Sequence, residues 1–372
     1  MPKQHRTGTP GRSPGRPRKQ TSALPSPSSK SQDRSNEVSR EILRAFRYGR
    51  ALSLLTLEIS FPKGTSDRVA YKGSDSLSGF FDPHLRNTDF SLPMRAGQLI
   101  LLLPETPEEG AEILGRRLLD IYLNTPGPAS SDPVSAGHFI RLNAGVSSIG
   151  VGGHTDSDLV STSQMAVRAA MMFSEPLISL NGLLNKQFSI YRWVSLYATL
   201  SDTEILVLSR VFERALKEPF GFMNKLSSQI ERLTGELELD SEDRDALAFW
   251  IYAMDLPKFS KMDQQQPVED PPEYTSRRRK LLFQRGLELF GYGKDAGGKS
   301  QKSRWNSPLA PGLFQAAIQI REFFEQFPEG SRDQFYTFIQ ELHERDFPSS
   351  VIRLLAKTSP SDWIPFREEM RF

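Results

Sequence analysis

The sequence predicts an α/β domain followed by an all-α domain, with a disordered tail in front of both. Between about residues 38 and 198, short apolar runs alternate with segments of helical period, and beyond residue 200 the helical period continues alone. Residues 1–37 are rich in Pro, Gly and Ser and hold few large apolar side chains, so they cannot bury enough surface to offset their ordering entropy. We therefore divide the 372 residues into 1–37, 38–198 and 199–372.

Elements of the first domain follow from short patterns. A helix is expected over residues 41–48, closed by Gly49, and buried strands over 52–59 and 99–103, the second stopped by Pro104. Thr106 and Pro107 open a helix that runs to about residue 122, with acids at its positive end. The remaining expectations are a strand over 140–150, a helix over 158–173 and a strand over 187–196.

The second domain reads as helices throughout. Ser201 and Glu204 form a capping pair at the start of the first one. A basic cluster, residues 277–280, stands at the start of another helix, where it opposes the helix dipole, so we expect it to meet a partner or to pack against acids. The further helices are expected at about 222–237, 241–254, 273–290, 312–326, 331–345 and 348–356.

Charge separates the tail from the rest of the chain. Residues 1–40 carry nine Lys and Arg against two acids, a net charge of +7, whereas the remainder holds 38 basic and 43 acidic side chains, a net charge of −5. Ser13-Pro14-Gly15-Arg16-Pro17-Arg18-Lys19 resembles an AT-hook, which enters the A·T minor groove, although Pro14 replaces the usual Arg. We favour a generic basic tail that contacts acidic partners or nucleic acid phosphates.

Composition also excludes several kinds of chemistry. The absence of cysteine excludes disulfides, thiol nucleophiles and thiolate zinc sites, and five scattered histidines leave little for metal binding. No apolar run approaches the ~18 residues that cross a bilayer. The N-terminus lacks the apolar region of a secretory signal. We expect a cytoplasmic protein without a membrane span.

Three segments stand out in the first domain: residues 44–55, Leu101-Leu102-Leu103-Pro104-Glu105-Thr106 and Val146-Ser147-Ser148-Ile149-Gly150-Val151. In sequence, order and nearly in spacing, they resemble the GGDEF, or diguanylate cyclase, family of bacterial signalling proteins. The resemblance implies a nucleotide-cyclase-like sheet with flanking helices. It also implies descent from enzymes that join two GTP molecules into cyclic di-GMP.

The positions that match the family's active site have changed. Counted back from Pro104, the signature pentapeptide is Arg95-Ala96-Gly97-Gln98-Leu99, so Gly97 and Gln98 replace acidic residues, and only Glu58 remains of the metal-binding acids. Phosphoryl transfer of this kind needs Mg²⁺ held by carboxylates. We therefore expect no cyclase activity and no cofactor. The loss of both signature glycines also weakens the expectation of a tight hairpin.

A second site of the family, which binds the product, matches better. Arg86-Asn87-Thr88-Asp89 falls at the offset of its Arg-x-x-Asp motif, and Arg117 matches a third position on the following helix. Guanidinium groups chelate phosphate and the guanine O6/N7 edge, and a carboxylate accepts from guanine N–H groups. The alternative is a solvated turn, since an exposed Arg–Asp pair contributes only about 0–1 kcal/mol and a second Arg-x-x-Asp begins at Arg117.

Residues 237–247 and 254–258 show a fainter similarity to HD-GYP phosphodiesterases, which degrade cyclic di-GMP. Met254 replaces the family's metal-binding histidine and leaves Asp255 behind, so the resemblance implies an inactive site. An unrelated helical bundle, in which Asp255 is a helix-terminus acid, is equally acceptable. His343 with Glu341 and Glu344 is better explained as a charged helix face than as a metal site.

The leading hypothesis is a non-catalytic cyclic di-GMP receptor that binds the dinucleotide through Arg86, Asp89 and Arg117. The helical domain or the tail would then signal to a protein partner, with nucleic acid a further possible partner of the tail. The alternatives are a ligand-independent scaffold built on the same domains, and residual enzymatic activity at Glu58 or Asp255.

Overall fold

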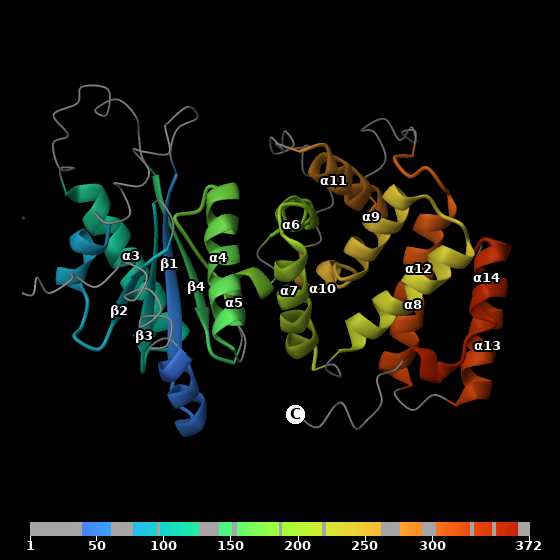
Figure 1. The fold of residues 1–372 in the computed structure, drawn as a ribbon, viewed down its shortest axis with the longest axis horizontal. Helices are drawn as coiled ribbons and strands as arrows, with labels where there is room; N and C mark the ends of the chain where they lie inside the picture. The colour runs from blue at the N-terminus through green and yellow to red at the C-terminus, as the bar shows by residue number, and fades with distance from the viewer. Residues whose placement is uncertain are drawn as a thin grey trace, which may run out of the picture.

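A computed structural model shows a five-stranded sheet with helices on both faces, continued by a group of helices without strands (Figure 1). The fold class predicted from the sequence is confirmed. Predictions for the tail, for Arg95 and Ala96, and for Glu344 lie outside the residues that the structure describes. The described residues are 39–60, 77–94, 97–125, 141–150, 155–185, 188–217, 221–261, 276–291, 303–327, 331–343 and 347–363.

The sheet has the order β2-β3-β1-β4-β5, with antiparallel neighbours except for β4 and β5, which run parallel. Strands β1 and β3 lie where the apolar runs predict them, and β4 lies in the segment 140–150 that alternates like a strand. The sequence pattern does not predict β2 or β5, because β2 is half-buried with a proline at its end and β5 has three residues. The strands are β1 (Leu52–Ser60), β2 (Phe90–Pro93), β3 (Gln98–Pro104), β4 (Arg141–Ser148) and β5 (Leu177–Ser179).

Alternate residues of the central strands enter two separate cores, as the two-residue period of a strand requires. Leu55, Leu57 and Leu101 face α3 (Glu108–Asn124), together with residues 77–81, which form a short helix. Leu54 and Leu102 face the other core, where the helix over residues 39–48 and α4 (Asp156–Met172) contribute. Figure 1 shows α3 and α4 on opposite faces of the sheet.

Helix α4 lies unusually close to β4. Gly145 makes this possible, because a Cβ there would stand 2.1 Å from the Val167 nitrogen and 2.5 Å from the Ser163 oxygen, both in the α4 backbone. Buried hydroxyl pairs join the same two layers: Thr56 Oγ1 and Ser163 Oγ lie 2.8 Å apart, and Ser147 Oγ and Thr162 Oγ1 lie 2.7 Å apart. Backbone contact therefore replaces side-chain packing at this point.

The strand expected over residues 187–196 is wrong, because these residues form α6 (Ile190–Tyr197). Ser189 caps the helix by accepting from the Arg192 N–H, and nearly every α6 side chain is buried. A segment buried on all sides shows no helical period in its sequence. Between β5 and α6 lies one further short helix, α5 (Leu180–Leu184).

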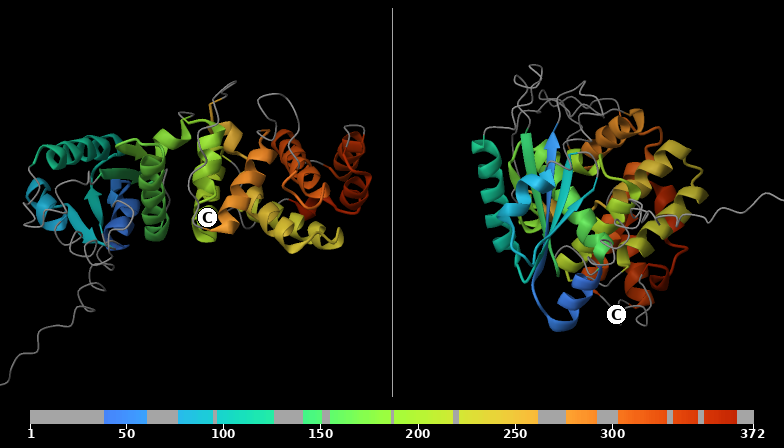
Figure 2. Two further views of the ribbon diagram at one scale, coloured as in Figure 1. Left: turned by 90° about the horizontal axis from the view of Figure 1, so that it is seen from above. Right: turned by 60° about the vertical axis from the view of Figure 1, so that its left-hand side comes forward.

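The helical domain, here α6 to α14, shares its core with the sheet. One buried apolar cluster runs from Met165 and Ala169 on α4, and Phe173 just after it, to Trp363 near the end of the described chain. The view from above in Figure 2 shows α4 standing between the sheet and these helices. In the helical domain, α6 is followed by α7 (Asp202–Ala215), α8 (Phe222–Glu236), α9 (Ser241–Ile251), α10 (Leu256–Phe259), α11 (Arg277–Leu289), α12 (Leu309–Gln326), α13 (Arg332–His343) and α14 (Ser349–Leu355).

Charged groups also lie inside the helical domain. Asp243 and Arg285 form a buried ion pair of 2.6 Å between α9 and α11, and Asp255, just before α10, contacts the guanidinium of Arg321 on α12. Asp255 is the residue before α10 but its side chain makes no capping hydrogen bond to that helix, and the contact with Arg321 gives its carboxylate a structural partner. Across the described ranges, no helix is both long enough and apolar enough to span a bilayer.

The basic cluster at the start of α11 packs against acids, as predicted. Arg277 lies 3.7 Å from Glu242, and Arg278 lies 3.7 Å from Asp202, measured between guanidinium nitrogen and carboxylate oxygen. All four residues are exposed or nearly so, which limits the contribution of each pair to about 0–1 kcal/mol. The pairs offset the unfavourable placement of positive charge at a helix N-terminus.

An ion pair with two hydrogen bonds ties α4 to α7. Arg168 Nη2 and Nη1 donate to the two carboxylate oxygens of Glu204 at 2.8 and 3.1 Å. Glu204 also completes the predicted capping box with Ser201. At the other end of α7, the Arg214 guanidinium donates to the Gly150 carbonyl at 3.0 Å. The sheet and the helical domain are therefore joined by polar contacts as well as by the apolar cluster.

This pair makes stability depend on pH. Burial raises the pKa of Glu204, but the Arg168 hydrogen bonds and charge outweigh it and hold that pKa below the ordinary 4.5. A carboxylate with a lowered folded-state pKa stabilises the fold above its unfolded pKa, and this contribution is lost as pH falls through the folded value. We expect Glu204→Gln to cost about 1–2 kcal/mol of unfolding free energy at pH 7.

Urea unfolding of both proteins between pH 7 and pH 3 measures this difference. The cost of Glu204→Gln should shrink as the pH drops below 4.5, the ordinary pKa of this carboxyl. The exposed Glu236 on α8 provides the matched control, and Glu236→Gln should change stability little at any of these pH values. A cost of Glu204→Gln that stays constant down to the lowest pH would contradict the assignment.

Candidate ligand-binding site

The positions that match the cyclase active site meet between β1 and β3. Glu58 and Gln98 stand directly opposite each other in the strand register, and the Gln98 side-chain amide donates to a Glu58 carboxylate oxygen at 2.7 Å. Gln98 is buried, and Gln164 on α4 donates to its carbonyl oxygen at 3.2 Å. Each of these side chains therefore has a hydrogen-bonding role within the chain itself.

This arrangement does not fit a magnesium ion. Mg²⁺ takes oxygen ligands in octahedral geometry, whereas the Gln98 group that faces Glu58 is an N–H donor. Gly97 has no side chain to offer. Within the described residues, no three His, Asp or Glu side chains are grouped so that they could hold a metal.

The hairpin that leads into this site is present despite the loss of the signature glycines. Strands β2 and β3 are paired from Phe90, opposite Leu102, to Pro93, opposite Leu99. The Met94 N–H donates to the Gln98 carbonyl at 3.1 Å. Gly97 adopts φ = 72°, a left-handed conformation that glycine tolerates and most residues do not. The glycine that replaces the acid at the third position of the pentapeptide thus has a positive φ.

The Arg-x-x-Asp motif forms a turn between the 3₁₀ helix η1 (Asp82–His84) and β2. The Asp89 N–H donates to the Arg86 carbonyl at 3.0 Å, and the Arg86 N–H donates to Asp89 Oδ2 at 2.9 Å. The Arg86 side chain is exposed. Asp89 Oδ1 is shielded from solvent and has no hydrogen-bond partner among the residues that the structure places. One carboxylate oxygen closes the turn and the other is unpaired.

Arg117 joins this turn from α3. Its guanidinium donates to the His84 carbonyl at 2.9 Å, two residues before Arg86. Aromatic packing holds the same segment against α3, since the rings of Phe80 and Tyr122 lie 6.0 Å apart, edge to face. The structure therefore places Arg86, Asp89 and Arg117 in one region, on the α3 side of the sheet.

The solved structures similar to this chain include GGDEF domains. The active GGEEF domain of a diguanylate cyclase from Vibrio cholerae is 24% identical, with 37% of this chain and 86% of that chain covered and a TM-score of 0.31. The GGDEF domain of PA1120 (YfiN or TpbB) from Pseudomonas aeruginosa is 17% identical, with 37% and 87% covered and a TM-score of 0.32.

A third similar structure is the diguanylate cyclase SiaD from Pseudomonas aeruginosa, solved in complex with its activator SiaC. It is 19% identical, with 38% of this chain and 54% of that chain covered and a TM-score of 0.31. No protein-family model matches the sequence, and no curated protein matches it significantly.

Sequence reasoning about the GGDEF positions missed two groups that shape these sites. Gln164 lies on α4, 66 residues from its partner Gln98, and nothing in its own helix marks it. The His84 carbonyl that receives Arg117 is a backbone group, so its role follows only from the fold. Glu58, Gly97 and Gln98 do lie together, as the motif spacing requires.

Proposed function

We propose that this protein is a non-catalytic receptor for cyclic di-GMP and that it binds the dinucleotide through Arg86, Asp89 and Arg117. The proposal depends mainly on one contact, the hydrogen bond from the Arg117 guanidinium to the His84 carbonyl at 2.9 Å. Residues 31 positions apart in the sequence are thereby brought to one region, and they are the residues that match the family's product-binding motif.

The chemistry of the three side chains suits a cyclic dinucleotide. Arg86 and Arg117 are both exposed, so their guanidinium groups can reach phosphate oxygens or the O6 and N7 acceptors of guanine. Asp89 Oδ1 can accept from guanine N–H groups. A buried acceptor without a partner costs about 1–3 kcal/mol, and a donor from the ligand would remove that cost.

The non-catalytic part of the proposal is supported by the Glu58–Gln98 hydrogen bond. An amide N–H occupies the carboxylate that would otherwise bind metal, and the partner acid of the clamp is absent. Likewise Asp255, the acid left in the HD-GYP-like segment, is paired with buried Arg321. We propose that neither position retains catalysis.

Signalling would pass from the sheet to a protein partner through the helical domain or the basic tail. A ligand shifts a conformational equilibrium only by binding two states differently. Helix α3 is a suitable element, because it carries Arg117 and its buried Glu108 accepts from the Ser148 hydroxyl and the Asn181 N–H, on β4 and α5. A change at Arg117 can thus reach the helices that follow the sheet.

Titration calorimetry of the full chain with cyclic di-GMP tests the proposal. Arg117→Ala and Arg86→Ala should each weaken binding about tenfold or more, because a hydrogen bond to a charged group contributes about 1.5–3 kcal/mol. Arg232→Ala removes an exposed arginine from α8 and should leave the affinity unchanged. Absence of binding by the unaltered protein, or equal binding by all four proteins, would overturn the proposal.

One observation favours the scaffold alternative: the Arg86–Asp89 turn is closed by hydrogen bonds between its own residues, so Asp89 already has a structural role. On that hypothesis, Asp89→Ala should destabilise the turn while partner binding stays insensitive to cyclic di-GMP.

The enzymatic alternative is tested separately, by incubating the protein with GTP and Mg²⁺, or with cyclic di-GMP and Mn²⁺, and separating the products. Turnover in either reaction would refute the non-catalytic assignment.

A further inference from the structure

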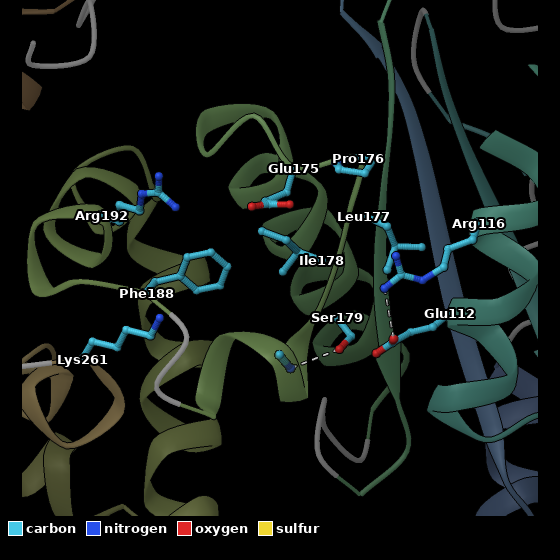
Figure 3. Close-up of a pocket in the computed structure, with 11 residues that line it drawn as sticks. Glu112, Arg116, Glu175, Pro176, Leu177, Ile178, Ser179, Phe188, Arg192 and Lys261 are labelled. Atoms are coloured by element: carbon cyan, nitrogen blue, oxygen red, sulfur yellow. Dashed lines mark hydrogen bonds and ion pairs between the residues drawn. The ribbon is translucent and has the colours of Figure 1, made fainter. Parts of the chain in front are cut away.

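A cavity of about 520 Å³ opens beside β5, where the sheet ends and the helical domain begins (Figure 3). Its walls come from α3, from the segment that contains β5 and α5, and from the start of the helical domain. Ligand pockets usually enclose about 300–1,000 Å³ and occur preferentially between domains. In size and position, this cavity is therefore a candidate binding site separate from the Arg86–Asp89 turn.

Three cationic side chains line the cavity, from places far apart in the sequence. Arg116 comes from α3, Arg192 from α6 and Lys261 from the segment after α10. Arg116 is paired with Glu112 one helical turn away, at 3.8 Å, and the other acid of the lining is the exposed Glu175. The three cations and two acids that line the cavity therefore sum to a charge of +1, although the chain beyond the tail carries a net negative charge.

The wall that carries Arg192 and Lys261 is held in place by the backbone. The Lys261 N–H donates to the Phe188 carbonyl at 2.8 Å, and Ser189 and Lys261 form a parallel bridge. Arg192 lies over the rings of Phe173 and Phe188, with its guanidinium carbon 5.4 and 6.0 Å from their centroids. Two cations therefore flank an aromatic ring on this wall, as Figure 3 shows.

The opposite wall mixes apolar and charged side chains. Pro176, Leu177 and Ile178 line it, together with Glu175 and with Arg116 and Glu112 from α3 (Figure 3). Since β5 is the last strand of the sheet, its backbone pairs with β4 on one side only. A ligand in this cavity would meet Arg192, Lys261 and the Phe188 ring on one side, and on the other the Leu177 and Ile178 side chains with charged groups beside them.

We propose that this cavity binds a small organic anion, with a phosphate or carboxylate group at Arg192 and Lys261 and an aromatic or apolar body between Phe188 and Ile178. Phosphate and carboxylate are the groups that Arg and Lys bind best. Such a ligand would contact both the sheet and the helical domain, so it would stabilise their arrangement in addition to any effect of a dinucleotide at Arg117.

Phenyl phosphate, benzoate and inorganic phosphate are suitable probes for calorimetry and saturation-transfer NMR on the full chain. Phenyl phosphate or benzoate should bind with a dissociation constant in the millimolar range or tighter, and about tenfold more tightly than inorganic phosphate. The tighter-binding one of phenyl phosphate and benzoate shows whether the site prefers a phosphate or a carboxylate group. No binding of the two aromatic probes at about 10 mM, or equal binding of inorganic phosphate, would overturn the proposal.

Substitution at Lys261 tests the location, because its side chain is exposed and its structural contacts are made by the backbone. Lys261→Ala should weaken binding of the preferred probe several-fold, and Lys261→Glu should abolish it. Lys357→Ala, which removes an exposed lysine beyond α14, is the matched control and should bind like the unaltered protein. Circular dichroism checks that each variant is folded. Undiminished binding by folded Lys261→Glu would show that the anion binds elsewhere.

Discussion

Asp243→Ala is expected to lower the free energy of unfolding by about 3–5 kcal/mol. The Asp243 carboxylate is fully buried, lies 2.6 Å from Arg285, and accepts from the Ser307 N–H at 2.7 Å and the Asn306 N–H at 3.3 Å. Alanine would leave the Arg285 guanidinium, also buried, without its counter-charge. Two backbone donors would lose their acceptor at the same time. Urea unfolding of the full chain at pH 7 measures the loss.

Two further variants separate this effect from a general loss of helix stability. Asp245 lies two residues further along α9 and is exposed, so Asp245→Ala should change stability by no more than about 0.5 kcal/mol. The double variant Asp243→Leu with Arg285→Met should be more stable than Asp243→Ala alone, since no charge then remains buried. The account is wrong if Asp243→Ala costs as little as Asp245→Ala.

Gly145→Ala is expected to destabilise the protein by about 3 kcal/mol, at the upper end of the usual cost of overpacking. The added methyl group would meet the backbone of α4 at Val167 and Ser163, at 2.1 and 2.5 Å, where no side-chain rotation can relieve the overlap. Helix α4 would have to move away from β4, which would weaken the hydroxyl contact between Thr56 and Ser163. Thermal and urea unfolding both report this change.

Gly235→Ala supplies the matched control. Gly235 lies near the end of α8 and has open space around it, so alanine there should stabilise the protein by up to about 1 kcal/mol through its better helix propensity. Because the two substitutions should change the stability in opposite directions, their comparison tests the close approach of α4 to β4. Equal stability of Gly145→Ala and the unaltered protein would mean that β4 and α4 do not touch in this way.

Much of the fold could be predicted from the sequence because its determinants are local. Strands β1 and β3 are apolar runs that end near prolines, β4 alternates as a strand does, and α7 begins at a capping box visible in four residues. Strand β5 could not be predicted, because a run of three residues is too short to show a pattern and is stabilised by its pairing with β4 and by burial of Leu177 and Ile178 in the tertiary fold. The error at α6 arises from burial on all sides, which removes the helical period.

The candidate sites likewise contain some contacts that the sequence predicts and others that depend on the tertiary fold. Motif spacing is enough to place Glu58 beside Gln98, since both positions belong to paired strands. The charges of Asp243 and Arg285 look like those of any solvated helix, and only the packing of α9 against α11 shows that they are buried partners. Likewise the cavity beside β5 draws its cations from three separate elements, whose meeting depends on the tertiary fold.

The apolar cluster that extends from α4 into the helical domain has a consequence for how this chain can evolve. Met165 and Ala169 would lose part of their apolar cover if the helices from α6 onward were removed. The sheet with α4 is therefore not a module that a genome could exchange freely among unrelated partners. Substitutions on that side of α4 and on the facing helices must have been selected together, so sequences that diverge here should change in matched pairs.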